Sequence, residues 1–234
     1  MTKDFIYFWP HITSREGAKE RANWVLRPIK RYNKKAKKVL ELGVGIGQVI
    51  VNFPKRFDIF GLDYEKKYIN YCRRKIKRGK FFVSSMHNFK INDKFDVIFS
   101  VYDSINFLKN FDQWKSTFRT VNKHLNDDGL FIFDMYTPKI LKDFKEKEAT
   151  ASRFSKGYIH DWSIIKGNNL TWDFKVFERI KKDTYKINEY KWKEVIHPVP
   201  KVKSALSKHF KILKTKLMEE DRRILFICRK IQSL

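Results

Sequence analysis

An acid and three glycines after a short apolar run are the residues of this chain whose types and spacing could hold a ligand. Glu41 interrupts the run at residues 38–42, and Gly43, Gly45 and Gly47 come directly after it. Glycines allow positive φ and close approach of a ligand to the backbone, and the first N–H groups of a following helix point at the same place. This stretch therefore predicts a strand, a tight turn and a helix start that bind a small polar ligand.

Further polar side chains follow other apolar runs. Asp63 comes after the run at residues 58–62, and Tyr102 comes after the clearest one, at residues 95–101. Other polar or soft side chains in such places are Tyr64, Ser85, Met86, His87, Asp103, Ser104 and Asn106. Because ligands of open parallel sheets bind outside the carboxyl ends of the strands, we expect these side chains to surround one crevice with the glycines.

The elements that must position these residues alternate along the first part of the chain. Apolar runs predict strands at residues 38–42, 58–62, 81–83, 95–101 and 130–135. Helices are predicted at residues 47–54, 65–78 and 110–125, with a short one after Pro138. An earlier helix is predicted from a capping box at Thr13 and Glu16, and Pro28 is expected to kink or split it. This alternation indicates an α/β fold with a mostly parallel sheet covered on both faces.

The pattern changes in the second part of the chain. Alternating segments at residues 158–165, 170–180 and 185–196 predict an antiparallel meander. A helix near residues 202–210 and strands at 212–218 and 223–229 complete the order. The chain shows no internal repeat or low-complexity linker, so we expect residues 1–234 to form a single domain. Within it, residues 155–200 are expected to be an inserted antiparallel β cap over the active site, and residues 1–35 a helical lid segment.

The glycine spacing distinguishes two kinds of ligand. A dinucleotide turn reads G-x-G-x-x-G, whereas residues 41–47 read Glu-Leu-Gly-Val-Gly-Ile-Gly. This sequence resembles the first motif of class I S-adenosylmethionine (SAM)-dependent methyltransferases. Asp63 stands where that family places the carboxylate that holds the two ribose hydroxyls, and residues 85–89 resemble its segment beside the adenine, with the usual leading acid absent.

The resemblance continues through residues 94–98, 102–108 and 128–134 and the final segment at 223–230. Each motif is weak alone, but five in the right order are specific. Similar proteins include amino-sugar N,N-dimethyltransferases and glycine or sarcosine N-methyltransferases. The resemblance implies a Rossmann-like fold with a seven-stranded, mostly parallel sheet, an antiparallel last strand and an inserted antiparallel β lid.

Specific roles follow from the resemblance and from position. SAM is the expected cofactor and S-adenosylhomocysteine its product. Its expected ligands are Glu41, Gly43, Gly45, Gly47, Asp63, Tyr64, Ser85, Met86, His87 and Tyr102. The expected acceptor site contains Asp103, Ser104, Asn106, Tyr136, Trp162, Trp172, Tyr190 and Trp192. Tyr102, His160 and His197 are candidate catalytic groups, although methyl transfer from a sulfonium chiefly needs alignment and exclusion of water. No metal is expected.

Composition leaves two alternatives to a small-molecule acceptor methylated at nitrogen or oxygen. The net charge of +25 suggests a polyanion partner, so the first alternative is an RNA methyltransferase. Against it, the fourth strand ends in Val-Tyr-Asp-Ser, without the Asn/Asp-Pro-Pro-aromatic sequence typical of enzymes that methylate exocyclic base nitrogens. The second alternative is a nonenzymatic SAM-binding protein, which the intact glycine turn disfavours.

Localisation follows from features of the chain itself. No apolar run is long enough to span a membrane, and the first residues lack the pattern of a secretory signal. Cys72 and Cys228 lack metal-ligand spacing. We expect a reduced cytoplasmic protein, and the sequence leaves the oligomeric state and the acceptor's identity open.

Overall fold

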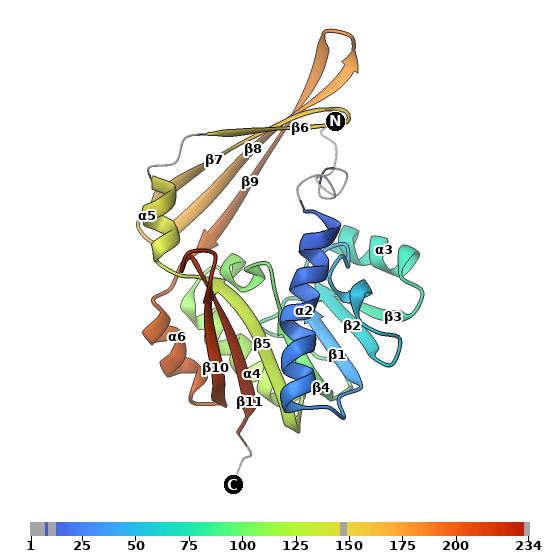
Figure 1. Ribbon diagram of the computed structural model, residues 1–234, viewed down its shortest axis with the longest axis vertical. Coiled ribbons are helices and arrows are strands. Elements are labelled where there is room, and N and C mark those ends of the chain that lie inside the picture. Colours follow the sequence, from blue (N-terminus) through green and yellow to red (C-terminus); the bar gives the residue numbers. More distant parts are fainter. Residues whose placement is uncertain (1–7, 9–12, 146–148, 232–234) are drawn as a thin grey trace.

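A computed structural model describes residue 8 and residues 13–145 and 149–231. Its centre is a seven-stranded sheet with the strand order β10-β11-β5-β4-β1-β2-β3 (Figure 1). Five strands pair in parallel: β1 (Lys38–Leu42), β2 (Asp58–Asp63), β3 (Gly79–Val83), β4 (Phe95–Ser100) and β5 (Leu125–Tyr136). Strand β11 (Arg223–Lys230) is antiparallel to both neighbours, β5 and β10 (Phe210–Met218). The predicted α/β fold, mostly parallel with an antiparallel last strand, is confirmed.

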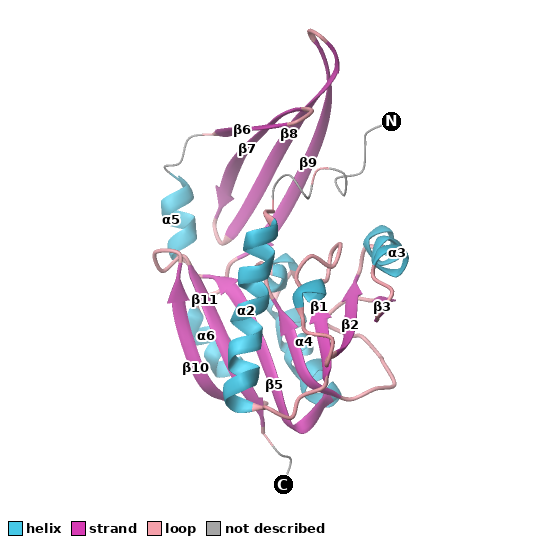
Figure 2. Ribbon diagram, turned by 45° about the vertical axis from the view of Figure 1, so that its right-hand side comes forward, coloured by secondary structure: helices cyan, strands magenta, loops and turns pink. Residues whose placement is uncertain are grey.

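Helices cover both faces of this sheet, each through one apolar stripe. Helices α2 (Arg15–Tyr32) and α3 (Lys66–Lys75) bury Val25 and Ile69 in the core on one face. Helices α4 (Phe111–His124) and α6 (Val199–Leu206) bury Trp114 and Leu206 on the other face (Figure 2). The short helix α5 (Lys139–Lys145) follows β5. Because helices cover both faces, a ligand can reach the sheet only at a strand end.

Two local predictions were wrong, and a third was wrong in part. Of the two outcomes expected at Pro28, the split does not occur: α2 continues to Tyr32, and Pro28 is buried within it. Its cap is Ser14, whose side chain accepts from the Gly17 N–H at 2.8 Å, instead of the expected box at Thr13 and Glu16. The helix expected at residues 47–54 is only the 3₁₀ turn η2 (Ile50–Asn52), because the chain is still in the glycine turn at Gly47 and Pro54 closes the segment.

A second, four-stranded sheet stands above the carboxyl-terminal edge of the first (Figure 1). It contains β6 (Thr150–Phe154), β7 (Gly157–Lys166), β8 (Asn169–Lys181) and β9 (Thr184–Val195), all paired antiparallel in sequence order. We call residues 150–195 the upper sheet. The sequence predicted three of its strands and missed β6, an edge strand that carries little apolar signal and pairs through a tight turn with β7.

The upper sheet is attached to the lower one through Asn106. This residue lies in the 3₁₀ turn η3 (Ser104–Phe107) after β4 and is fully buried. Its Nδ2 donates to the Val195 carbonyl at 3.0 Å, and its Oδ1 accepts from the Tyr136 N–H at 3.1 Å. One amide therefore joins the ends of β4, β5 and β9, which places β9 over the carboxyl ends of the lower strands.

Candidate active site

The glycine turn follows β1 as predicted, and its backbone requires glycine. Gly43, Gly45 and Gly47 have φ of +73°, +51° and +80°. A Cβ at Gly47 would lie 2.3 Å from Ile76 Cδ1, so its packing excludes a side chain as well. The Gly43 N–H donates to the Leu62 carbonyl at 2.9 Å. The turn is therefore fixed beside the end of β2.

Asp63 ends β2 and points its carboxylate at this turn. Its Oδ2 accepts from the Gly45 N–H at 2.9 Å and its Oδ1 from the Glu65 N–H at 3.0 Å. Burial raises the pKa of Asp63, and hydrogen bonds from the backbone of Glu65, Gly45 and Tyr64 oppose that rise because they favour the charged form. The two carboxylate oxygens have more lone pairs than these three bonds use, so acceptor capacity remains for a ligand hydroxyl.

Glu41, near the end of β1, is buried with an incomplete set of hydrogen bonds. Its side chain lines the same cavity as Asp63, and among the described residues its Oε2 has no hydrogen-bond partner. Burial raises the pKa of Glu41 well above its ordinary value, and the nearby charge of Asp63 adds to this rise. A buried acceptor without a partner is costly, so a ligand donor at this point would stabilise the site.

A cavity of about 810 Å³ opens from the turn toward the upper sheet. Its floor is the carboxyl edge of β1, β2 and β4, and its wall on the far side includes Trp192 and Val195 of β9. The residues predicted from sequence that line it are Glu41, Gly43, Gly45, Asp63, Tyr64, Ser85, Met86, His87, Tyr102, Ser104 and Trp192. Gly47 lies behind the turn against Ile76. The structure thus gathers most of the expected SAM ligands in one cavity.

Neither candidate histidine reaches this cavity. His197 follows β9 and is packed between the rings of Phe111 and Trp114, at centroid distances of 4.9 and 5.1 Å. Burial lowers its pKa to about 4. His160 lies on β7 and lines a different, shallow hollow with Tyr158. For His160, strand alternation decided this, since the sequence shows which residues share a face but not which face meets the cavity.

The expected acceptor residues of the upper sheet do not all reach the cavity. Trp192 lines the cavity, whereas Trp172 donates from Nε1 to Glu194 Oε1 at 2.8 Å and packs on Phe144. Tyr190 packs in the apolar cluster of the upper sheet. Trp162 lies beside His160, with ring centroids 5.4 Å apart.

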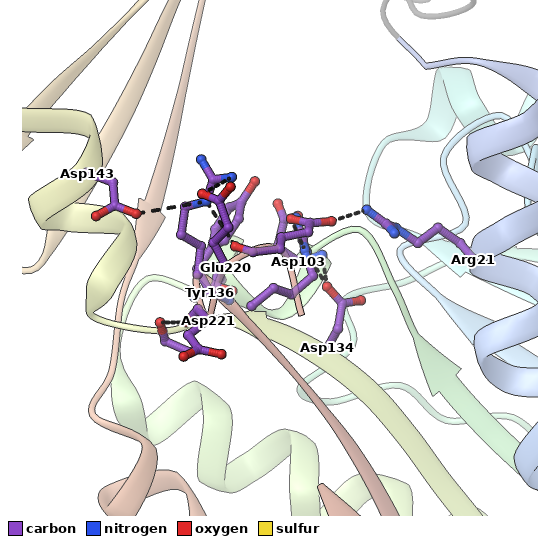
Figure 3. A network of polar contacts seen from close by, with 12 residues as sticks. Arg21, Asp103, Asp134, Tyr136, Asp143, Glu220 and Asp221 are labelled. Carbon is purple, nitrogen blue, oxygen red and sulfur yellow. Dashed lines mark hydrogen bonds and ion pairs between the residues drawn. The ribbon is translucent and has the colours of Figure 1, made fainter. Parts of the chain in front are cut away.

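Asp103 belongs to a network of ion pairs behind the cavity wall (Figure 3). Arg223 Nη1 pairs with Asp103 Oδ1 at 2.6 Å and with Asp134, and its Nε pairs with Glu219 Oε2 at 3.0 Å. Glu219 Oε1 in turn contacts Arg21 Nη2 of α2 at 2.5 Å. Asp103 therefore connects the end of β4 with β5, β11 and α2.

This network holds a strained backbone at the cavity floor. Tyr102 and Asp103 are left-handed, with φ of +56° and +48°, which costs on the order of 1–3 kcal/mol for each residue. The Asp103 N–H donates to Asp134 Oδ2 at 3.1 Å, and the Tyr102 ring lies 5.2 Å from the Arg21 guanidinium. Expected acceptor residue Tyr136 also lies in this network, its ring 4.4 Å from the Arg223 guanidinium. These contacts set the direction in which Tyr102 faces the cavity.

Some residues of the cavity and of the network behind it were missed from sequence. The cavity is also lined by Gln48, Tyr68, Phe107, Lys109, Gln113, Lys191 and Lys193. The sequence offers no pattern that singles out these three lysines as cavity residues, because the chain has 51 Lys and Arg residues in all. Arg223 could have been found, because a charged residue that begins an apolar strand has to be paired once it is buried.

The fold and this cavity are those of a SAM-dependent methyltransferase. Residues 39–129 match a family described as "Methyltransferase domain", and this match spans the glycine turn, Asp63 and β4. The chain is therefore a SAM-dependent methyltransferase, and the residues present suit SAM: Asp63 offers oxygens for hydroxyls and Glu41 an unpaired acceptor.

Proteins with related sequences carry the same activity in their names. A protein named as a methyltransferase from Geobacillus sp. (strain WCH70) is 25% identical over 168 residues, which cover 69% of this chain and 67% of that protein. The dTDP-3-amino-3,4,6-trideoxy-alpha-D-glucopyranose N,N-dimethyltransferase of Streptomyces venezuelae is 22% identical over 100 residues, 42% of each chain.

Solved structures share the fold at low identity. A sugar N-methyltransferase from Streptoalloteichus sp ATCC 53650 has a TM-score of 0.84 at 15% identity, over 99% of this chain and 94% of its own. A SAM-dependent methyltransferase from Clostridium acetobutylicum ATCC 824 has a TM-score of 0.82 at 19% identity, over 91% of this chain and 92% of its own. At 99% of this chain, the first alignment includes the upper sheet as well as the lower one. Within the described residues, no helix is long and apolar enough to cross a membrane.

Proposed function

We propose that this methyltransferase acts on a nitrogen atom of a small molecule, with amino sugars as the acceptor class. The observation that carries the proposal is the roof of the cavity: Trp192 and Val195 of β9 close the side opposite the glycine turn. A roofed cavity of about 810 Å³ suits two small molecules better than a folded RNA. The relatives named for sugar nitrogen methylation support the choice of acceptor.

The SAM contacts follow the cavity wall. Asp63 would accept from the ribose hydroxyls, and Glu41 would accept from the amino-acid end or a bound water. Met86 and His87 would border the adenine, with the His87 ring held by a 2.6 Å contact between its Nδ1 and Ser85 Oγ. Tyr64 and the backbone of Gly43 and Gly45 would complete this site.

The chain's own contribution is alignment and exclusion of water. SAM, when bound, supplies a methyl group on a sulfonium that is already a good leaving group. Tyr102 and Ser104 face the cavity from the lower sheet and Trp192 from above, so an acceptor between them would be oriented on both sides. Such orientation can correspond to effective molarities on the order of 10⁵ M or more.

We also propose that the upper sheet, with the start of α2, is the lid of the active site. Trp192→Ala removes one wall of the cavity and should raise the acceptor KM about tenfold. The reason is that the acceptor loses about 1.5 kcal/mol or more of binding free energy from contact with the buried aromatic ring. Trp162→Ala, on the face of the upper sheet that carries His160, is the matched control. Equal KM values for the two variants would remove the lid assignment.

Binding is tested first, without an acceptor. Calorimetric titration with S-adenosylhomocysteine should show tight binding by the wild type and a loss of about tenfold to a hundredfold in Asp63→Ala, as expected for a charge-assisted hydrogen bond. Asp58→Ala, at the exposed start of the same strand β2, is the control and should bind normally. Equal binding by Asp63→Ala and Asp58→Ala would show that the ligand lies elsewhere.

Acceptor class is tested by product formation. We expect mass spectrometry to find methylated products with amino sugars and other small amines, and none with the matching alcohols or with total tRNA. The high net charge, together with Lys109, Lys191 and Lys193 at the cavity, is what favours an RNA acceptor as the second candidate. Turnover on tRNA alone would replace the proposed function by that one.

We further propose that the enzyme works in the reducing cytoplasm. Cys72 and Cys228 are both buried free thiols, as expected in that compartment. Fractionation of the source cells with an antibody against the protein checks this placement.

A further inference from the structure

The upper sheet carries aromatic and aliphatic side chains on both of its faces. One face packs on Phe8 and on α5, through clusters that contain Phe174 and Leu170. Because successive residues of a strand point to opposite faces, the residues between these form a second face, which we call the outer face. Its aromatic and aliphatic side chains include Tyr158, His160, Trp162, Phe177, Tyr185 and Ile187. An antiparallel sheet that is wet on one side ordinarily carries polar side chains there, so this composition indicates a face that is covered in use.

The outer face is uncovered within the chain. None of these six side chains belongs to a hydrophobic cluster of the described residues. Tyr158, Phe177 and Ile187 stand side by side on three neighbouring strands, and Ile187 is 54% exposed. Tyr158 and Phe177 also border an open hollow of about 370 Å³. Single exposed apolar side chains are normal, but a contiguous group on one face of a sheet marks an interaction surface.

The charges of the outer face are balanced at its centre. Lys175 pairs with Glu189 at 3.3 Å and Lys191 with Asp173 at 2.9 Å, all four on this face. The remaining cations lie toward its margins: Arg153, Arg179 and Lys193. A neutral apolar centre inside a polar rim is the anatomy of a protein–protein interface. It offers a polyanion little free positive charge, although the chain has a net charge of +25.

The charge of the chain also indicates which protein fits this face. Two copies that each carry +25 repel one another, so they can associate only where the local charge is balanced and apolar area is buried. The outer face meets both conditions. Its lysine–acid pairs can also face the same pairs of a second copy, so the face is complementary to itself.

The outer face is large enough for a stable dimer. Strands β7, β8 and β9 have 10, 13 and 12 residues. With about 3.3 Å per residue and about 4.8 Å between strands, the face covers roughly 600 Å². Two such faces bury about 1,200 Å² in total, which reaches the lower end of the range for specific interfaces. Twisted sheets pack face to face in this way about 10 Å apart.

We propose that the outer faces of two copies of this chain pack on each other, so that the protein is a homodimer held together by its upper sheets. Both copies use the same surface, so the contact has two-fold symmetry and closes at two. The partner covers the back of β9, whose opposite face carries Trp192 at the cavity.

Sedimentation velocity of the full chain, treated with nuclease, tests the dimer. The wild type should sediment with twice the mass of the chain. Ile187→Lys should raise the dissociation constant of the dimer at least about 100-fold, because symmetry places the new charge in the apolar interface twice. Leu217→Lys is the matched control: Leu217 is 51% exposed on β10 of the lower sheet, and its variant should remain a dimer.

A second variant and the effect of salt make the test independent of one substitution. Tyr158→Glu, on β7, should also give monomers, and an unchanged far-ultraviolet circular dichroism spectrum shows that both variants are folded. The wild-type dimer should tighten between about 50 mM and 500 mM salt, because salt screens the repulsion between the copies.

Three results would overturn the proposal. They are a monomeric wild type, a dimer that Ile187→Lys and Tyr158→Glu leave intact, and a dimer that Leu217→Lys weakens as much as Ile187→Lys does. A monomeric wild type that binds polyuridylate or anionic vesicles, more weakly at high salt and more weakly in Ile187→Glu, would assign the outer face to that polyanion instead.

Discussion

The backbone N–H of Gly45 donates to Asp63 Oδ2 at 2.9 Å, across 18 positions of the chain. This bond joins the turn after β1 to the end of β2, two adjacent strands of the sheet. The carboxylate and the open glycine backbone therefore form one surface.

Substitution of Gly47 by alanine should cost more stability than the same substitution at Gly167, another glycine with positive φ. In Gly47→Ala both the backbone strain at φ +80° and the contact with Ile76 act, so we expect a loss of about 2–4 kcal/mol in the free energy of unfolding. Gly167→Ala, at φ +58° with no neighbour within 4 Å, carries the strain alone and should lose about 1 kcal/mol. Urea unfolding measures both, and equal losses would refute the packing argument.

Arg223 should be far more important for stability than its neighbour in sequence. Arg223→Met leaves Asp103 and Asp134 buried without their cation, for which we expect a loss of about 3–5 kcal/mol. Arg222→Met removes only more exposed pairs, such as that with Glu220 at 3.3 Å, and should cost less than about 1 kcal/mol. Thermal and urea unfolding check the ranking, which a similar loss in both variants would contradict.

His197 should make the fold less stable in mild acid. Its pKa is about 4 in the folded protein because of burial, against 6.5 for an ordinary histidine. Between these pH values, His197 binds more protons in the unfolded chain than in the folded one. The stability that comes from keeping His197 neutral is therefore fully present above about pH 6.5. As the pH falls toward 4, the free energy of unfolding decreases by up to about 1.4 kcal/mol per pH unit.

Replacement of His197 isolates this effect. In His197→Phe, which can pack between Phe111 and Trp114, the stability difference from the wild type should shift in favour of the variant as the pH falls from 7 to 5. Urea unfolding at several pH values gives the comparison, and a pH-independent difference for His197→Phe would contradict the prediction.

Asn106 should control how firmly the upper sheet is held. Asn106→Ala removes the bonds to Val195 and Tyr136, so hydrogen exchange should speed up in β9 more than in β1. Each lost bond to a buried backbone group corresponds to about 1–3 kcal/mol. Asn122→Ala, which removes a similar bond to the His209 carbonyl at the other end of the sheet, is the control. Unchanged exchange in β9 would show that the upper sheet is held by other contacts.

Local sequence determined the lower sheet and the cofactor side of the cavity. Every strand from β1 to β5 was predicted, because strands buried on both faces are continuous apolar runs. The glycine turn and Asp63 were also predicted, since positive φ and a strand-ending acid leave a signal within a few residues. Pro28 shows the limit of local rules: tertiary packing keeps α2 continuous through a residue that usually breaks a helix.

Only the tertiary structure decided the acceptor side. Whether His160 or Trp192 meets the cavity depends on which face of the upper sheet turns toward the lower sheet, and period-2 alternation is the same for either face. The Asn106 amide and the packing of β9 fix that choice, over distances in the chain that no local pattern encodes. The sequence by itself therefore determined the glycine turn and Asp63, whereas long-range packing decided which side chains of the upper sheet line the cavity.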